Sequence, residues 1–154
     1  MINVLFVCHG NICRSTMAEF VFKDMIQKQN LNQQFHIASA GTSSEEIGNP
    51  VHKGTRNKLA EYGISTDGKY AVQLTKADYQ KYDYILGMDT YNMRNMVRLF
   101  KHDPEQKIKL LLEYAGEHSS IADPWYTGDF ETTYKDVKRG CKALFAHIVE
   151  EHNL

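Results

Sequence analysis

The chain has 154 residues, which is about one domain's worth and enough to bury a single sizeable core. Hydrophobic residues make up 42% and charged residues 24%, and the formal net charge of -1 gives no overall attraction to nucleic acid or to an anionic membrane surface. No apolar run reaches transmembrane length, and the N-terminus lacks the basic region and cleavage site of a signal peptide, so we expect a cytoplasmic protein. Three cysteines are an odd and sparse set, which fits that compartment and argues against a disulfide framework.

The predicted elements alternate in type along the chain. Short apolar runs are typical of buried strands of a parallel sheet, and the segments between them carry apolar residues at helical intervals. In chain order we expect strand 2–7, helix 16–26, strand 35–40, helix 51–62, a short helix starting at about 75–78, strand 82–88, helix 90–100 behind an Asp89 cap, strand 108–112 and helix 130–151. This alternation predicts a single α/β domain, 1–154, with an open parallel sheet and helices on both faces.

The most informative segment is Cys8-His9-Gly10-Asn11-Ile12-Cys13-Arg14-Ser15, which lies between the first strand and the first helix. A glycine-containing loop that leads into a helix N-terminus binds anions, because its N–H groups converge and the helix dipole favours negative charge. The same field stabilises a thiolate, here at Cys8. Arg14 presents a planar fork that can hold two phosphoryl oxygens. Cys8 and Arg14 together therefore indicate phosphoryl transfer through a covalent phosphocysteine.

Other residues near this loop have predicted structural roles. Gly10 and Asn11 tolerate the left-handed backbone that a nest of N–H groups requires. Ser15 has two open interpretations, as a cap of the helix or as a hydroxyl that donates to the cysteine sulfur. Thr16 and Glu19 have the spacing of a capping box, which is a purely structural role.

A phosphomonoesterase also needs an acid to protonate the leaving oxygen and then a base to activate water, and Asp123 is the best candidate. It stands in Asp123-Pro124-Trp125-Tyr126, where the following Pro biases Asp123 toward an extended backbone and holds its carboxylate out on a loop. The aromatic pair beside it could wall a slot for a planar substrate group. Taken alone, the segment also fits a turn around a buried Trp; its combination with the cysteine loop favours the functional interpretation.

Together these motifs resemble the low-molecular-weight protein tyrosine phosphatase family over nearly the whole chain. The shared segments, in the family's order and approximate spacing, are 4–15, Ser39-Ala40-Gly41-Thr42, Gly87-Met88-Asp89 and Asp123-Pro124-Trp125-Tyr126. The resemblance implies a four-stranded, flavodoxin-like sheet and hydrolysis of phosphotyrosine in proteins or peptides, with inorganic phosphate as a product and no metal or other cofactor. We expect a monomer or a weak dimer, because the near-neutral surface neither demands nor forbids association.

The resemblance also implies roles for individual residues. Cys8 would be the nucleophile, Arg14 the phosphate clamp, and Asp123 the general acid and then the general base. The residues that would hold the loop by hydrogen bonds are Asn11, Ser15 and Ser39. The residues that would bind the phosphate or border the cleft are His9, Gly10, Asn11, Ile12, Cys13, Ser15, Trp125 and Tyr126. Cys13 could form a disulfide with Cys8 under oxidation, or be a small hydrophobe packed beneath the loop, and the two are compatible.

The chain also departs from its apparent relatives. Many of them have Pro where this chain has Thr16, a mild change in the first helical turn. Relatives often carry a His and an Arg where Lys69 and Val72 stand. If that His orients the loop in the relatives, its role is either reassigned or missing in this chain; the alternative is that the difference is simple surface drift. Phosphoarginine-selective relatives tend to place Thr at the position of Ile12, so Ile12 favours phosphotyrosine.

Three other functions fit the sequence less well. Thioredoxin-coupled arsenate reductases share this loop but need additional cysteines after the third strand, and 76–100 contains none. A phosphocysteine carrier must not hydrolyse its intermediate, so it has no use for a water-activating Asp123. A non-catalytic anion-binding module leaves Cys8 without a role. The seven histidines show no metal-ligand spacing, and we expect the His9 side chain near the rim of the loop.

Overall fold

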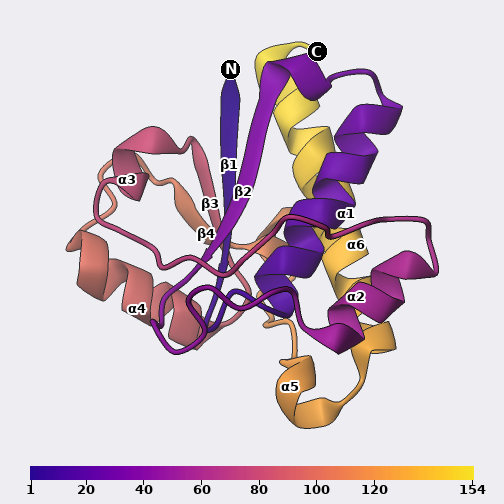
Figure 1. Cartoon of the computed structure of the whole chain (residues 1–154). Coiled ribbons are helices and arrows are strands. Elements are labelled where there is room, and N and C mark those ends of the chain that lie inside the picture. The colour runs from indigo at the N-terminus through magenta and orange to yellow at the C-terminus, as the bar shows by residue number, and fades with distance from the viewer.

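The computed structural model describes residues 1–154, and a four-stranded parallel sheet lies at its centre (Figure 1). The strands are β1 (Ile2–Cys8), β2 (Phe35–Gly41), β3 (Tyr84–Gly87) and β4 (Ile108–Leu110). All neighbours are parallel and the order is β2-β1-β3-β4, which is the strand order of flavodoxin-like folds. The predicted α/β fold is confirmed.

Helices cover both faces of the sheet. One layer is formed by α1 (Arg14–Lys28), α2 (Lys53–Ala60) and α6 (Phe130–His152), and the other by α3 (Asp78–Lys81) and α4 (Thr90–Phe100). The two layers lie to the right and left of the strands in Figure 1. A short helix, α5 (Pro124–Thr127), and two 3-10 helices, η1 (Asn32–Gln34) and η2 (Leu111–Ala115), complete the chain.

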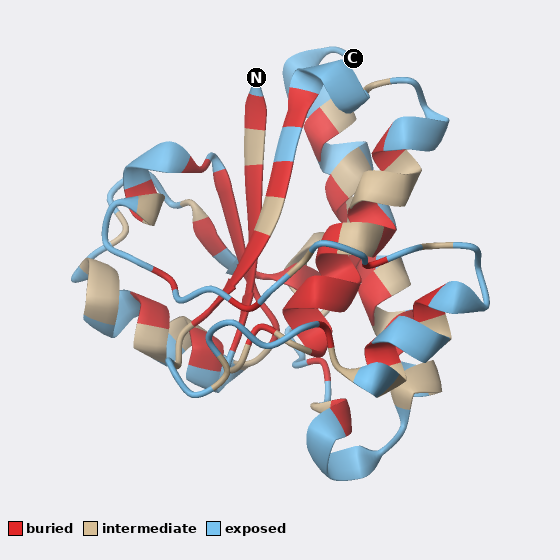
Figure 2. Ribbon diagram, in the orientation of Figure 1, coloured by how far each residue is buried: buried red, intermediate tan, exposed pale blue.

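Strand β1 is the centre of the hydrophobic core. Its side chains alternate between the two faces, so Val4 and Phe6 pack in the larger cluster with α1 and α6, whereas Leu5 and Val7 pack in the smaller cluster with α3 and α4. The strand is therefore buried nearly throughout (Figure 2), which explains why its sequence is a continuous apolar run. Cys8, its last residue, is held by the most deeply packed element of the fold.

Some local predictions differ from the structure. Strand 108–112 ends at Leu110, because the chain turns into η2 to pack against α6, where a Cβ at Gly140 would lie 2.6 Å from Leu111 Cγ. Helix 51–62 is shorter, because His52 caps it through Nδ1, which accepts from the Gly54 N–H at 2.9 Å. The Asp89 cap of α4 is confirmed.

The prediction of a capping box formed by Thr16 and Glu19 is wrong. Helix α1 begins at Arg14, two residues before the predicted start, and its N-cap residue Cys13 makes no side-chain cap. The Thr16 hydroxyl donates to the Cys13 carbonyl at 3.0 Å, and the Glu19 carboxylate accepts a hydrogen bond from Ser39 instead. The hydroxyl thus makes a local contact in the first turn of α1, whereas the carboxylate makes a tertiary contact with β2.

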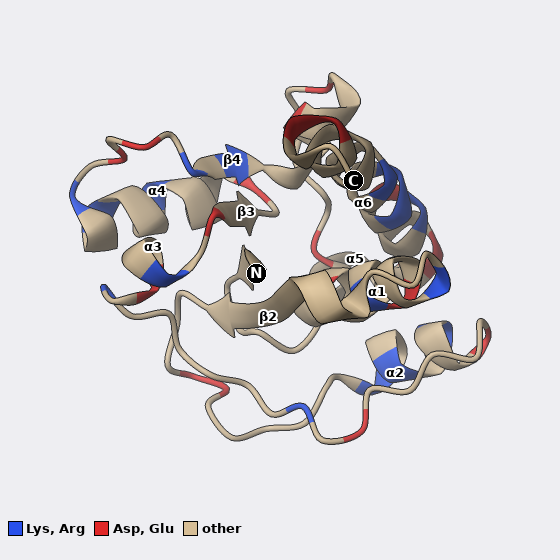
Figure 3. Cartoon of the chain, turned by 90° about the horizontal axis from the view of Figure 1, so that it is seen from above, with Lys and Arg blue, Asp and Glu red and all other residues tan.

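Charged residues of both signs are interspersed over the two helical layers (Figure 3). None of the helices combines the length and the hydropathy of a membrane-spanning segment.

The carboxyl ends of the parallel strands meet at one edge of the sheet. Cys8 ends β1, Gly41 ends β2, and Asp89 follows β3 after a single intervening residue. Helix α5 lies at this same edge in Figure 1. Ligands of open α/β sheets bind at this edge, and here it collects the residues that the sequence marks as functional.

Candidate active site

The loop between β1 and α1 forms the floor of the site. Asn11 has a φ of 60°, a left-handed conformation that Asn adopts more readily than most residues. The loop leads straight into the N-terminus of α1, so the helix dipole favours negative charge there. This is the anion-binding arrangement that the sequence predicts.

Polar side chains lie buried beneath this loop. Ser15 Oγ is 3.0 Å from Cys8 Sγ, and Ser15 is not a helix cap, since it is the second residue of α1. Asn11 Nδ2 donates to the hydroxyls of Ser15 and Ser39, both at 2.9 Å, and Asn11 Oδ1 accepts from the Val72 N–H at 3.0 Å. These contacts join the loop to β2 and to the segment before α3.

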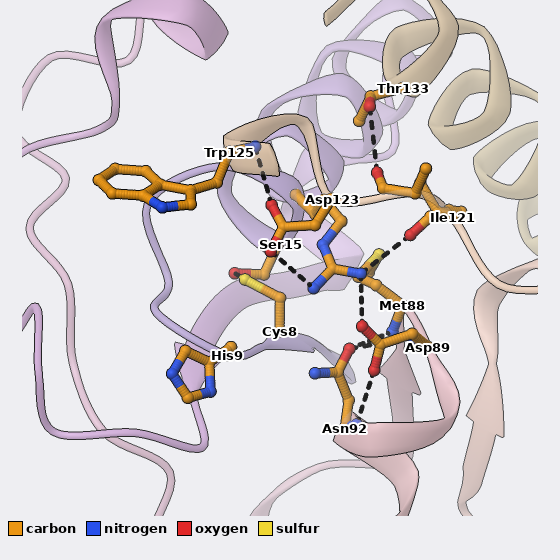
Figure 4. A network of polar contacts seen from close by, with 12 residues as sticks. Cys8, His9, Ser15, Met88, Asp89, Asn92, Ile121, Asp123, Trp125 and Thr133 are labelled. Carbon is orange, nitrogen blue, oxygen red and sulfur yellow. Dashed lines mark hydrogen bonds and ion pairs between the residues drawn. The ribbon is translucent and has the colours of Figure 1, made fainter. Parts of the chain in front are cut away.

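Arg14 is 3% exposed and its guanidinium is held from several sides. Its Nη1 donates to Asp89 Oδ2 at 2.7 Å and to the Ile121 carbonyl at 2.9 Å, and its Nη2 lies 3.4 Å from Asp123 Oδ2 (Figure 4). Burial alone would lower the pKa of Arg14, but its electrostatic interactions with the neighbouring Cys8 and Asp89 outweigh burial and hold that pKa above its ordinary value. The cation is therefore permanent and its orientation is fixed.

Asp123 faces the same space from the start of α5. Its backbone is extended, as the following Pro predicts, with φ -81° and ψ 113°. Oδ1 caps α5 by accepting from the Trp125 N–H at 3.0 Å, which leaves Oδ2 toward Arg14 (Figure 4). The carboxylate is thus anchored by one oxygen and presented to the cleft by the other.

A cavity of about 130 Å³ brings most of the predicted site residues together. It is lined by Cys8, His9, Gly10, Ile12, Cys13, Arg14, Glu45, Glu46, Asp123, Trp125 and Tyr126. Asn11, Ser15 and Ser39, three further predicted residues, lie buried beneath the loop and do not line the cavity. The His9 side chain is 55% exposed and lies 3.3 Å from the Glu45 carboxylate, at the rim as expected.

Two aromatic side chains form an exposed wall of the cavity. Trp125 is 56% exposed and Tyr126 84% exposed, so the prediction of a buried Trp as an alternative role is wrong. The His52 ring contacts Trp125 edge-on, with centroids 5.5 Å apart, and stacks on Phe130. The indole of Trp125 is therefore supported by the His52 ring, which in turn stacks on α6, while both aromatic side chains stay largely open to solvent.

The three cysteines are free and buried. Burial, together with the neighbouring Cys8 and Asp123, raises the pKa of Cys13 to about 12. Burial raises the pKa of Cys141 as well, on α6 and away from the cavity. Cys13 therefore stays a protonated thiol at ordinary pH, and both of the interpretations offered for it from the sequence remain predictions.

Sequence reasoning does not predict several contacts that organise the site. Asp89 pairs with Arg14, whereas the sequence indicates only a helix cap at Asp89, within the segment Gly87-Met88-Asp89 that the family shares. Glu45 and Glu46 belong to no recognisable motif. Lys69 donates from Nζ to the Ser39 carbonyl at 2.8 Å and lies 3.4 Å from a Glu19 oxygen, so this departure from the relatives is not surface drift.

Val72 contributes its backbone N–H to Asn11, and any residue other than Pro could do so. The departure at this position therefore leaves the hydrogen bond intact. No group of three or more His, Cys, Asp or Glu side chains is arranged to hold a metal ion.

Comparisons with known proteins agree with this geometry. Residues 3–154 match the family described as low molecular weight phosphotyrosine protein phosphatase. The chain is 42% identical to the low molecular weight protein-tyrosine-phosphatase YfkJ of Bacillus subtilis over 100% of both chains, and 42% identical to the low molecular weight phosphotyrosine protein phosphatase of Gallus gallus over 92% of both.

Solved structures give the same result. The crystal structure of YfkJ superposes with a TM-score of 0.94, covering 98% of this chain and 96% of that one, at 42% identity. The structure of a drosophila arginine phosphatase superposes with a TM-score of 0.84, covering 94% and 96%, at 32% identity. This chain therefore belongs to the low molecular weight phosphotyrosine protein phosphatase family.

Proposed function

We propose that this protein hydrolyses phosphotyrosine in proteins or peptides through a phosphocysteine intermediate. Cys8 is the nucleophile, Arg14 the phosphate clamp, and Asp123 the general acid and then the general base. The observation that carries the proposal is that these three side chains line one small cavity at the N-terminus of α1. Membership of a phosphatase family supports the class of reaction.

The proposed reaction has two steps. First, the Cys8 thiolate attacks phosphorus, and the bond from phosphorus to the phenolic oxygen breaks as Asp123 gives that oxygen a proton. Second, the Asp123 carboxylate takes a proton from water, whose oxygen attacks phosphorus; the sulfur–phosphorus bond breaks, and inorganic phosphate and the thiolate are released. In this second step the Ser15 hydroxyl, 3.0 Å from the sulfur, can donate to the departing thiolate.

The contacts of Arg14 support its role as a clamp. A guanidinium has five N–H donors, and the contacts to Asp89, Ile121 and Asp123 use three of them. Two donors remain for a bidentate contact to phosphoryl oxygens. Charge spreads over those oxygens during transfer, so a buried and fixed cation stabilises the transition state more than a mobile one would.

The cavity wall supports an aromatic substrate. Trp125 and Tyr126 offer apolar faces on which a phenolic ring can pack. Phosphoarginine is the second candidate, favoured by the likeness to the drosophila arginine phosphatase. Ile12 lines the cavity and adds apolar surface at the position where phosphoarginine-selective relatives tend to have Thr, so phosphotyrosine is the better fit.

The rim of the cavity is acidic. Glu45 and Glu46 line it beside the cysteine loop, and the Glu45 side chain is 72% exposed. Negative charge near the entrance attracts cations and repels anions. We therefore expect the preferred phosphotyrosine to be flanked by basic residues. The three free cysteines of this chain fit a protein of the reducing cytoplasm.

Turnover of p-nitrophenyl phosphate by the wild type, Cys8→Ser and Asp123→Asn tests the mechanism. Cys8→Ser should be inactive, and Asp123→Asn should lose about 10²- to 10⁴-fold in kcat while its affinity for vanadate stays near that of the wild type. Peptides that carry phosphotyrosine or phosphoarginine then separate the two substrate candidates.

Asp129→Asn is the matched control for Asp123. Asp129 also caps a helix nearby, accepting from the Thr132 N–H at 3.0 Å, but it does not line the cavity. It should therefore keep wild-type turnover. Equal rates for the wild type and Cys8→Ser would rule out the thiolate mechanism, and an Asp123→Asn variant that loses vanadate binding but keeps kcat would rule out the acid–base role.

A further inference from the structure

The hydrogen bonds beneath the loop end at a buried carboxylate that the proposed chemistry does not use. Glu19 lies on α1 with its side chain 4% exposed. Its Oε1 accepts from the Ser39 hydroxyl at 2.6 Å and lies 3.4 Å from Lys69 Nζ, while its Oε2 lies 2.5 Å from Lys23 Nζ. A carboxylate buried to this degree needs partners of this kind to remain charged.

The two lysines approach Glu19 from different directions. Lys23 is on α1 itself, one turn along, with its side chain 43% exposed. Lys69 comes from the segment before α3, is 13% exposed, and donates to the Ser39 carbonyl as well. Of the two lysines, therefore, only Lys69 also contacts the carboxyl end of β2.

Lys69 also begins the stretch of chain that holds Asn11. This stretch runs along the end of β2, where the Gly41 N–H donates to the Val72 carbonyl at 2.8 Å and the Leu74 N–H donates to the Gly41 carbonyl at 2.7 Å. The Val72 N–H then reaches Asn11 Oδ1. The Lys69 ammonium is the side-chain anchor of the stretch on β2.

The direction of each hydrogen bond follows from this arrangement. A backbone N–H can only donate, so Oδ1 of Asn11 must accept from Val72 and Nδ2 must donate to both serines. Ser15 accepts from Asn11, so its own hydrogen is left for Cys8 Sγ. The hydrogen that Ser15 directs at the sulfur thus depends on how firmly Asn11 is held.

We propose that Lys69 is a positioning residue for the Cys8 thiolate. It neutralises Glu19 and anchors the 69–72 stretch, so that Asn11 orients the Ser15 hydroxyl toward the sulfur. Lys69 makes no hydrogen bond to Cys8 and does not line the cavity, so it acts only through this chain of contacts. The inference rests on the proposed role of Cys8, and it gives a function to the position where relatives often carry His.

The test is the pH profile of Cys8 alkylation by iodoacetamide, followed by peptide mass spectrometry, in Lys69→Met. The thiolate is the reacting form, so weaker donation from Ser15 moves the midpoint of the profile upward, by about one pH unit if the hydrogen bond is lost. Lys69→Arg, which keeps the charge and the donors, should restore the wild-type midpoint. The charged groups that line the cavity with the sulfur are Arg14, Glu45, Glu46 and Asp123, and the other titratable groups there are His9, Cys13 and Tyr126; all of them are unchanged in every variant.

Lys23→Met is the matched control. It removes the other cation from Glu19 but no contact with β2 or with the 69–72 stretch, so its midpoint should stay at the wild-type value. If Lys69→Met lowers the temperature of unfolding but leaves the midpoint unchanged, Lys69 is merely structural and the proposal is overturned. Equal shifts in Lys69→Met and Lys23→Met would also overturn it, because neutralising Glu19 would then be the whole effect.

Lys69→Gln covers the case in which Lys69→Met does not fold. Its amide can still donate to the Ser39 carbonyl but carries no charge, and its midpoint should lie between those of Lys69→Arg and Lys69→Met; a wild-type midpoint overturns the proposal. Alkylation needs no turnover, so these outcomes are independent of the proposed reaction. Failure of the proposed function would appear separately, as a wild type that does not hydrolyse p-nitrophenyl phosphate.

Discussion

Replacing Asp89 by Asn tests whether a buried ion pair holds Arg14 in its working orientation. Asp89 Oδ1 caps α4 by accepting from the Asn92 N–H at 2.8 Å, and Oδ2 accepts from Arg14 Nη1 at 2.7 Å. Asn is as good a cap as Asp, so the cap survives. The Asn amide N–H groups would then face the Arg14 N–H groups, and donor would oppose donor.

The size of the effect follows from the burial of the pair. Unit charges roughly 4 Å apart attract by about 4 kcal/mol at an effective dielectric constant of about 20. Removing one partner of a buried pair costs about 3–5 kcal/mol. Because Asp89 is 18% exposed and Asp123 stays near Arg14, we expect a somewhat smaller cost, about 2–3 kcal/mol of unfolding free energy. For a chain of this length that is a fall of roughly 5–10 °C in Tm.

Urea unfolding and p-nitrophenyl phosphate kinetics measure both consequences. The value of kcat/KM should fall by about 10²-fold, since a clamp displaced by an ångström misplaces the phosphoryl group. Asp129→Asn, which alters a helix cap without a buried arginine, should cost under about 1 kcal/mol. If Asp89→Asn is no more destabilising than Asp129→Asn and retains full kcat/KM, the ion pair does not position Arg14.

Burial and the neighbouring Cys8 raise the pKa of Cys13 to about 12, so its thiolate is absent below about pH 10, and iodoacetamide at pH 8 should modify Cys8 alone. Modification of Cys13 in Cys8→Ser at the wild-type Cys8 rate would contradict this. Mild peroxide should inactivate reversibly through a Cys8–Cys13 disulfide, and reversibility retained in Cys13→Ser would count against it. In Gly41→Ala the new Cβ would lie 2.8 Å from the His9 carbonyl oxygen and 3.1 Å from the Gly10 carbonyl carbon, so the loop must move. We expect the free energy of unfolding in urea to fall by about 1–3 kcal/mol and kcat/KM to be reduced. Unchanged kinetics would show that the close contact is removed by a movement that leaves the cysteine loop in place. Wild-type protein should prefer phosphotyrosine peptides with Arg flanks to those with Glu flanks, and the double variant Glu45→Gln, Glu46→Gln should lose the preference at low salt. A preference of the same size in the variant would exclude the acidic rim as its source.

The parts of the fold that follow from local sequence were predictable. Strand β1, the cysteine loop and α1 are consecutive, so their apolar pattern and the glycine-containing loop were enough to identify an anion site. The end of β4 could not be predicted from local sequence, because Leu111 and Leu112 continue an apolar run that fits a strand equally well. Their turn into η2 depends on packing against α6, which no local pattern records.

At the site, too, features that follow from local sequence were predictable and those that depend on tertiary contacts were not. Asp123 is 109 residues from Arg14 and was found because the reaction needs an acid and the family resemblance supplied one. The sequence marks Asp89 as a helix cap, Glu19 as part of a capping box and Lys69 as a departure from the relatives. Their roles at the site were not predictable, because each depends on a tertiary contact. Glu19 was also misassigned, since its spacing from Thr16 fits a capping box, and only the fold reveals that its carboxylate turns toward Ser39.

The exposed aromatic wall has a thermodynamic consequence. Trp125 and Tyr126 hold much of their ring surface in water, with His52 and α6 supporting the indole from behind. A phenolic ring that packs on them removes apolar surface from water on both sides of the contact, and burial of apolar surface makes the heat capacity of binding negative. Calorimetric titration of Cys8→Ser should therefore give a more negative heat capacity change for an aryl phosphate than for an alkyl phosphate. The difference in binding enthalpy between an aryl phosphate and an alkyl phosphate would then change with temperature.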